Sequence, residues 1–139
     1  MAHWLFKSEP EVFSYADLVA KGAAGQEWDG VRNYQARNHM RAMKVGDTGY
    51  FYHSNEGKEI VGIVEVAKAA HPDSTDDSGT WECVDIRALR PVPDPVPLTA
   101  VKAEPRLKEM ALVANSRLSV QPVTDEEWAI VCAMGGVAP

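Results

Sequence analysis

Residues 60–69 (IVGIVEVAKA) restrict the fold most, because apolar side chains occupy both faces of this segment if it is extended. Alternate side chains of a strand point to opposite faces. One face then carries Ile60, Val64 and Val66, and the other carries Val61 and Ile63. A strand that is apolar on both faces is typical of a curled or closed sheet that is also covered on its outside.

Other segments predict more strands of the same sheet. Period-two patterns predict strands at residues 48–54 (TGYFYHS) and 82–90 (ECVDIRALR), and residues 55–58 predict a hairpin turn before residue 60. The first and last strands are expected at residues 3–7 and 117–123. The stretch with four prolines, residues 91–97 (PVPDPVP), is expected to be an extended connector, and residues 71–80 (HPDSTDDSGT) a polar surface loop.

Helix-capping patterns place helices beside these strands. Ser14 with Asp17 resembles a capping box and predicts a short helix that ends near Ala20. Asn33 is a good N-cap for a helix over residues 34–43. Thr124 with Glu127 predicts a terminal helix. The sequence therefore predicts an α+β fold: one domain over residues 1–139, with a mixed, curved sheet or small barrel flanked by helices.

Composition excludes several classes of protein. Hydrophobic residues make up 45% of the chain and charged residues 24%, which are ordinary globular values. No apolar run approaches the roughly 20 residues that span a bilayer, and no signal peptide is recognisable, so we expect a cytoplasmic protein without a membrane partner. Cys83 and Cys132 are far apart in sequence, and the four histidines show no ligand spacing, so we expect no metal and no cofactor.

The segment WDGVRNYQARNHM, residues 28–40, concentrates planar and hydrogen-bonding side chains that a purely structural helix does not need. Residues 28–44 carry a local balance of +3, whereas the whole chain carries −6 and its remainder therefore −9. A cationic segment on an anionic body can form a local anion site while non-specific binding of polyanions stays weak.

A helix that starts at Tyr34 sorts this segment into faces. Its core face is expected to carry Ala36, Met40 and Met43, and another face carries Tyr34, Arg37, Asn38 and Arg41. The backbone amides of residues 28–33 precede the helix and predict an anion site at its N-terminus. This chemistry suits a planar, polar ligand that is attached to phosphate. The structural alternative is a solvated helix face on which Trp28 and Tyr34 only cover the core.

Two strand ends carry similar chemistry, whereas catalytic templates match poorly. Residues 7–10 (KSEP) and 52–54 (YHS) place a cation, hydroxyls and an imidazole where barrels place ligand sites. The alternative is that Ser8 and Ser54 only satisfy turn amides. The chain has no G-x-S-x-G elbow, phosphate-binding loop or dinucleotide fingerprint, so an enzyme is the weaker hypothesis.

Four motifs together resemble the EVE domain family. They are WLFKSEP, WDGVRNYQARN, GDTGYFYHS and RLSVQPVT-x-EEW, and they span residues 4–128. The resemblance implies a PUA-like fold, a small β-barrel flanked by helices, related to the YTH readers of methylated RNA and to the ASCH domains. It also implies a non-catalytic reader that accepts a modified base of DNA or RNA, such as a 5-substituted cytosine, in an aromatic and polar pocket.

Carried over from the family motifs, the residues that would line or border the pocket are Lys7, Ser8, Trp28, Val31, Arg32, Asn33, Tyr34, Arg37, Tyr52, His53, Ser54, Arg117, Leu118 and Ser119. Stacking on an aromatic side chain supplies about 1–3 kcal/mol per base. Asn33 or Ser8 could read a Watson–Crick edge, and Arg32 or Arg37 could hold phosphate. A methyl group on the base would add roughly 0.8 kcal/mol against apolar surface such as Val31.

One departure from the family limits the expected partner. Family members often have a longer, aromatic and proline-rich insertion where this chain has the acidic residues 71–80. An acidic loop beside the groove would repel a long duplex, which favours a short single-stranded segment or a nucleotide. Two alternatives stay open: an ASCH-like hydrolase with His53 as base and Lys7 or Glu9 assisting, and a small-molecule-binding module on the same barrel.

Overall fold

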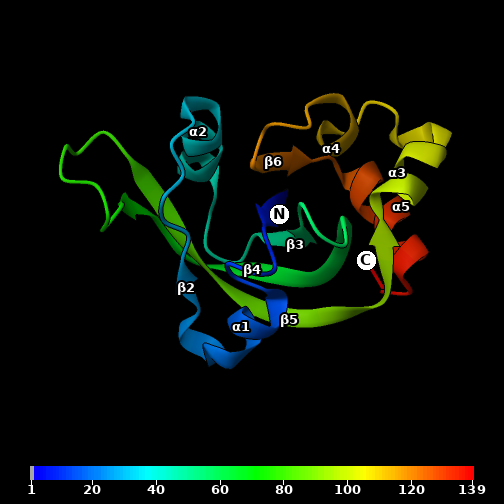
Figure 1. The fold of residues 1–139 in the computed structure, drawn as a ribbon, viewed down its shortest axis with the longest axis horizontal. Helices are drawn as coiled ribbons and strands as arrows, with labels where there is room; N and C mark the ends of the chain where they lie inside the picture. Colours follow the sequence, from blue (N-terminus) through cyan, green and yellow to red (C-terminus); the bar gives the residue numbers. More distant parts are fainter. Residues whose placement is uncertain (1) are drawn as a thin grey trace.

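The computed structural model describes residues 2–139, which form a mixed six-stranded sheet. Helices lie around this sheet (Figure 1). The strands are β1 (His3–Ser8), β2 (Gln26–Glu27), β3 (Thr48–His53), β4 (Glu59–Pro72), β5 (Glu82–Pro97) and β6 (Val120–Val123). Their order is β2-β5-β4-β3-β1-β6, with β1 and β3 parallel and the other pairs antiparallel. The predicted α+β class is confirmed.

The helices α1, α2 and α5 begin at the capping residues that the sequence indicates. The α-helices are α1 (Tyr15–Ala20), α2 (Tyr34–Ala42), α3 (Leu98–Ala103), α4 (Ala111–Ala114) and α5 (Asp125–Gly135), and the 3-10 helices are η1 (Gly22–Ala24) and η2 (Pro105–Leu107). Ser14 and Thr124 each form a full capping box, and the side chain of Asn33 caps α2. None of the described helices is long and apolar enough to cross a membrane.

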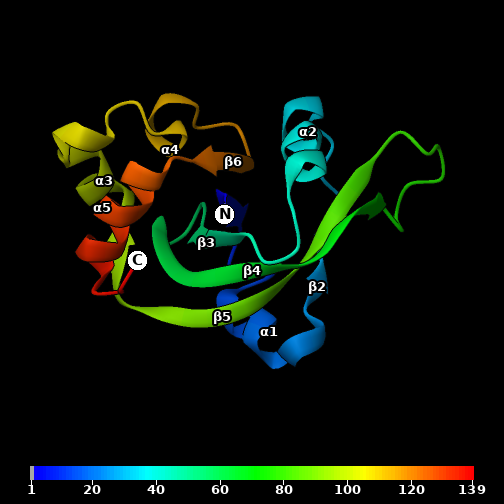
Figure 2. The ribbon, with the colours of Figure 1, turned by 180° about the vertical axis from the view of Figure 1, so that it is seen from behind.

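The long strands β4 and β5 bend together (Figures 1 and 2). A hydrophobic core lies on each face of the sheet. The first core includes Trp4, Phe6, Trp28, Met40, Phe51 and Val64. The second includes Leu5, Tyr50, Ile63, Val96, Val131 and Trp128. The helices α3, α4 and α5 gather at one end of the sheet, whereas α1 and α2 lie toward the other end, where β2 also lies. Burial on both faces, predicted from residues 60–69, is therefore confirmed.

A bulge in β4 changes which side chains share a face. Tyr52 pairs with Ile60 and Phe51 pairs with Gly62, so Val61 is an extra residue in the ladder. Ile60 therefore joins Ile63 in the second core, whereas Val64 and Val66 belong to the first. The prediction that Ile60 shares a face with Val64 was wrong, because strict alternation does not allow for the bulge.

Three predicted boundaries also differ from the structure. Residues 91–97 are the second half of β5, not a connector. Their prolines occupy every second position, so the missing N–H groups lie along one edge. In the part of the chain that the structure describes, β4 is the only strand that pairs with this half of β5. β4 continues through His71 and Pro72, and β6 begins only at Val120.

Closure into a barrel is not confirmed. The pairings run from β2 at one edge to β6 at the other, and within residues 2–139 no strand pair joins these two edges.

Candidate functional site

A cavity of about 500 Å³ lies between the end of β1, the turn after it, β2 and the segment that leads into α2. Its volume falls in the usual range of ligand pockets. The lining residues are Lys7, Ser8, Val12, Phe13, Gln26, Glu27, Trp28, Asp29, Gly30, Val31, Arg32 and Ser119. The lining thus combines aromatic and aliphatic surface with charges of both signs. We call this cavity of about 500 Å³ the main cavity.

The structure brings part of the predicted site together. The predicted residues that line the main cavity are Lys7, Ser8, Trp28, Val31, Arg32 and Ser119. Tyr52 and Ser54 line a second cavity of about 260 Å³, in which Lys7 also takes part. Neither of these two cavities includes Asn33, Tyr34, Arg37, His53, Arg117 or Leu118.

Trp28 is held rigidly at the wall of the main cavity. Its ring makes edge-to-face contacts with Phe6, Phe13 and Phe51, with centroid separations of 5.7, 6.1 and 5.7 Å. Its backbone N–H donates to the carbonyl of Val84 at 2.8 Å. Only 9% of the residue is exposed. Trp28 therefore belongs to the core and can offer a preorganised surface to a ligand, but it cannot be removed without loss of packing.

Lys7 and Ser8 of the KSEP motif differ in whether they keep hydrogen-bond donors for a ligand. The Ser8 hydroxyl donates to the carbonyl of Phe13 at 2.6 Å, which stabilises the turn as the structural alternative supposed. The Lys7 ammonium donates to the carbonyl of Ser116 at 2.6 Å, and burial lowers the pKa of Lys7. Lys7 lines both cavities and keeps donors for a further acceptor, because an ammonium has three.

The anion site predicted before α2 is filled by a carboxylate of the protein itself. Asp73 Oδ2 accepts hydrogen bonds from the Gly30 backbone N–H at 2.9 Å and from Arg32 Nη1 at 3.1 Å. Its Oδ1 accepts from the backbone and the hydroxyl of Thr75. Asp73 is buried in this position, so its charge does not face the solvent, whereas 39% of the Arg32 side chain stays exposed at the main cavity.

The segment after Asp73 also covers the polar face of α2. Trp81 stacks on Tyr34 with centroids 4.8 Å apart. The Arg37 guanidinium lies 4.8 Å from the Tyr34 ring and donates to the carbonyl of Thr80. Arg41 forms an ion pair with Glu82. Most of the cationic face is therefore engaged by this acidic segment, which charge counting within residues 28–44 could not show.

Of the four remaining predicted residues, Asn33, His53 and Leu118 have structural contacts. Asn33 Oδ1 accepts from the Ala36 N–H and caps α2. His53 Nε2 accepts from the Tyr15 N–H at 3.1 Å, and burial lowers the pKa of His53. Leu118 is buried in the first core, and Arg117 is exposed on the turn before β6.

Sequence reasoning missed two acidic residues of the main cavity. Glu27 and Asp29 flank Trp28 directly, and this adjacency was the available signal. Burial, followed by the charges of Asp73 and Glu27, raises the pKa of Asp29. The missed apolar lining comes from Val12 and Phe13, in the turn after β1.

Comparison with known proteins decides the family. The model of the EVE domain matches residues 2–134. The chain belongs to the EVE domain family. Human thymocyte nuclear protein 1 is 38% identical to this EVE domain over 165 residues, which cover 96% of the chain and 73% of the human protein.

Solved structures agree in fold over nearly the whole EVE domain. A protein of Agrobacterium tumefaciens superposes with a TM-score of 0.98 and 60% identity, covering 99% of this chain and 95% of that one. The human THYN1 protein, crystallised in complex with DNA that contains 5-methylcytosine, gives a TM-score of 0.92 and 38% identity, and all of both chains is covered. This EVE domain therefore has the PUA-like fold of its relatives.

Proposed function

We propose that this EVE domain is a non-catalytic reader that takes a modified nucleobase of DNA or RNA, of the 5-substituted cytosine type, into the main cavity. The observation that carries the proposal is the lining: one rigid indole, apolar side chains and a few polar groups around about 500 Å³. The human relative crystallised with DNA that contains 5-methylcytosine supports it.

The lining can supply each interaction that such a base needs. Trp28 offers aromatic surface, and stacking contributes about 1–3 kcal/mol per base. The exocyclic amino group of cytosine can donate a hydrogen bond to the carboxylate of Asp29 or Glu27. A 5-methyl group against Val31 or Val12 adds roughly 0.8 kcal/mol, which corresponds to about a fourfold preference.

The partner is a short or single-stranded segment, or a nucleotide. Lys7 and Arg32 are the two cations in the lining of the main cavity, and each already donates to an acceptor of the protein. Two cations give only weak attraction to a long polyanion, so the affinity must come from the base and its nearest backbone.

No specific observation favours the hydrolase alternative. It required the imidazole of His53 as a base, but Nε2 accepts a backbone hydrogen bond from Tyr15 and the residue does not line the main cavity.

The test is a binding screen of short single strands that differ in one base: cytosine, 5-methylcytosine, 5-hydroxymethylcytosine or N6-methyladenine. Calorimetry would be run on the wild type, on Asp29→Ala and on the exposed control Asp77→Ala at two salt concentrations. Trp28→Ala is a poor first variant, because Trp28 packs against three aromatic rings.

We expect one modified strand to bind most tightly, and Asp29→Ala to weaken it about tenfold while Asp77→Ala does not. If no strand binds, or if every strand binds equally well to all three proteins, the reader proposal fails. Binding of a metabolite without any response to oligonucleotides would then select the small-molecule alternative.

A further inference from the structure

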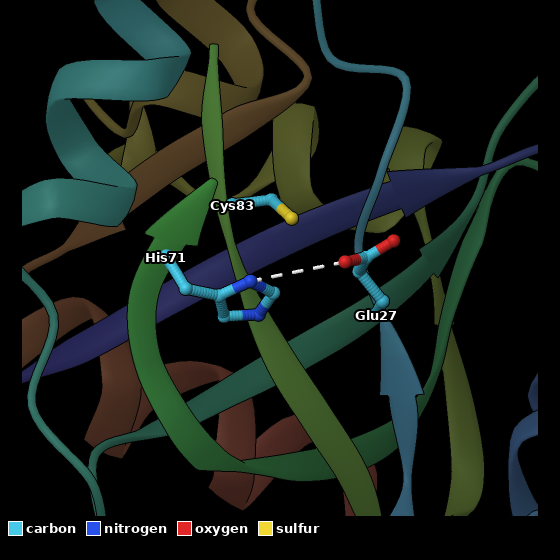
Figure 3. Close-up of side chains that lie close together, drawn as sticks. All are labelled: Glu27, His71 and Cys83. Carbon is cyan, nitrogen blue, oxygen red and sulfur yellow. Dashed lines mark ion pairs between the residues drawn. The ribbon is translucent and has the colours of Figure 1, made fainter. Parts of the chain in front are cut away.

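Three side chains with metal-binding chemistry meet where β2, β5 and β4 run side by side (Figure 3). In the antiparallel ladders, His71 of β4 is the partner of Cys83 of β5, and Glu27 of β2 is the partner of Asp85 of β5. Cys83 and Asp85 are two residues apart and therefore point to the same face of their strand. The pairing of these strands thus brings together residues as far apart in the sequence as Glu27 and Cys83, which are separated by 56 positions.

The distances suit a single ion. One ligand atom from each of Glu27, His71 and Cys83 lies within 4.8 Å of the others, and His71 Nδ1 lies 3.8 Å from Glu27 Oε2. Bond lengths of 2.0–2.3 Å around a tetrahedral Zn²⁺ place neighbouring ligand atoms about 3.3–3.7 Å apart. Side-chain rotation must bring the three ligand atoms to this spacing, chiefly by movement of the partly exposed Glu27 and His71, since Cys83 is buried.

Neighbouring side chains already orient two of the three ligands. The other imidazole nitrogen, Nε2, lies 2.8 Å from Asp85 Oδ1, the outer contact that metal-binding histidines usually make. The Ser74 hydroxyl donates to the Glu27 carboxylate. Nδ1 faces Glu27 at 3.8 Å and also lies 3.0 Å from the Pro72 carbonyl, so a metal ion bound at Nδ1 would replace the contact with Pro72.

The local charge also favours a cation. The carboxylates of Glu27 and Asp85 lie 3.8 Å and 2.8 Å from the two imidazole nitrogens of His71 and give this place a negative potential. The same negative potential attracts a divalent ion, and binding of the ion displaces the thiol proton.

We propose that Glu27, His71 and Cys83 bind a divalent cation of the zinc type, with one position left for water or another ligand. Sulfur, imidazole and carboxylate together select Zn²⁺ or Co²⁺ over Mg²⁺, which takes oxygen ligands. Glu27 also lines the main cavity, so the ion would fix one polar group of its wall. The site does not depend on the reader function.

The test uses Co²⁺ as a spectroscopic probe on the full, reduced chain without an affinity tag. We expect a thiolate-to-cobalt charge-transfer band together with intense visible bands of tetrahedral cobalt, and Zn²⁺ should displace both. Cys83→Ser should abolish the charge-transfer band. Cys132→Ser is the matched control, because Cys132 is the other buried thiol and lies in the second core beside Tyr50.

Two further variants keep the test decisive if Cys83→Ser does not fold. Glu27→Gln changes a partly exposed residue of a two-residue strand, and Asp85→Asn removes the outer contact of His71. Each should weaken Co²⁺ binding by at least about tenfold. Absence of the charge-transfer band in the wild type would overturn the proposal, as would an unchanged affinity in Glu27→Gln and Asp85→Asn.

Discussion

The guanidinium of Arg32 donates to the buried carboxylate of Asp73 at 3.1 Å and so ties the acidic loop to the segment before α2. The exposed fraction of the side chain is 39% for Arg32 and 1% for Asp73. Truncation of Arg32 and truncation of Asp73 should therefore affect stability differently. Removal of the carboxylate leaves several donors without an acceptor, whereas removal of the guanidinium leaves a carboxylate with other donors.

The first prediction is an unequal effect of the two truncations. Asp73→Ala should lower the free energy of unfolding by about 2–4 kcal/mol, because Gly30 N–H, Thr75 N–H and Arg32 lose their acceptor. Arg32→Ala should cost only about 1 kcal/mol, since Asp73 keeps its bonds from Gly30 and Thr75. Urea unfolding followed by tryptophan fluorescence measures both. Equal losses, or no loss in Asp73→Ala, would contradict this account.

A second prediction concerns the contact between Gly62 and Tyr15. A Cβ atom at Gly62 would lie 2.2 Å from the Tyr15 ring, and the Tyr15 hydroxyl is held by the carbonyls of Ile63 and Arg90. The ring cannot move without losing these bonds, so Gly62→Ala should lower stability by about 3 kcal/mol.

The control for this contact is a double-mutant cycle. In a Tyr15→Ala background, the same Gly62→Ala change should cost less than about 1 kcal/mol, because the clash is gone. If the cost of Gly62→Ala is the same in both backgrounds, then the ring contact is not its cause.

Asp47 gives a prediction on pH. Burial alone would raise the pKa of Asp47, but hydrogen bonds from the Lys44 N–H, the Trp4 indole and the Ala2 N–H outweigh it and hold the pKa below its usual value. A carboxyl with a lowered folded-state pKa stabilises the protein above the unfolded-state value, near pH 3.8, and this stability is lost as the pH falls through the folded-state pKa.

Asp47→Asn should therefore be less stable than the wild type at neutral pH, and the difference should shrink as the pH falls below about 4. Urea unfolding at a series of pH values measures this difference. A difference that stays constant over the whole acid range would mean that the charge of Asp47 does not contribute.

The fourth prediction concerns Lys7, which lines both cavities. If the proposed reader places a base in the main cavity, Lys7→Met should weaken modified and unmodified strands to a similar extent and reduce the slope of affinity against salt by about 1. Lys21→Met changes an exposed lysine outside both cavities and should leave the slope unchanged. A loss confined to one modified strand would instead make Lys7 a reader of the base.

Local sequence signals predicted many elements because their causes are local. The Ser14 and Thr124 capping boxes and the Asn33 cap join groups three residues apart, so the chain near each helix start is enough to specify it. The strand at residues 91–97 was missed, because a proline-rich stretch becomes a strand only when a long partner such as β4 is present to pair with it.

The candidate site was predicted only in part for the same reason. Lys7, Ser8 and Trp28 were identified from their motifs, and they do line the main cavity. The sequence could not show that Asp73 fills the anion site before α2, because that contact spans more than 40 residues and depends on the fold of the loop.

The sequence by itself determined the apolar periodicities, the helix starts and the family motifs, all of which act over short distances along the chain. The tertiary structure decided the rest: the bulge that moves Ile60 to the second core, the engagement of Arg32 by Asp73, and the meeting of His71 with Cys83. These depend on the register between strands, which packing on both faces of the sheet selects and which no single segment specifies.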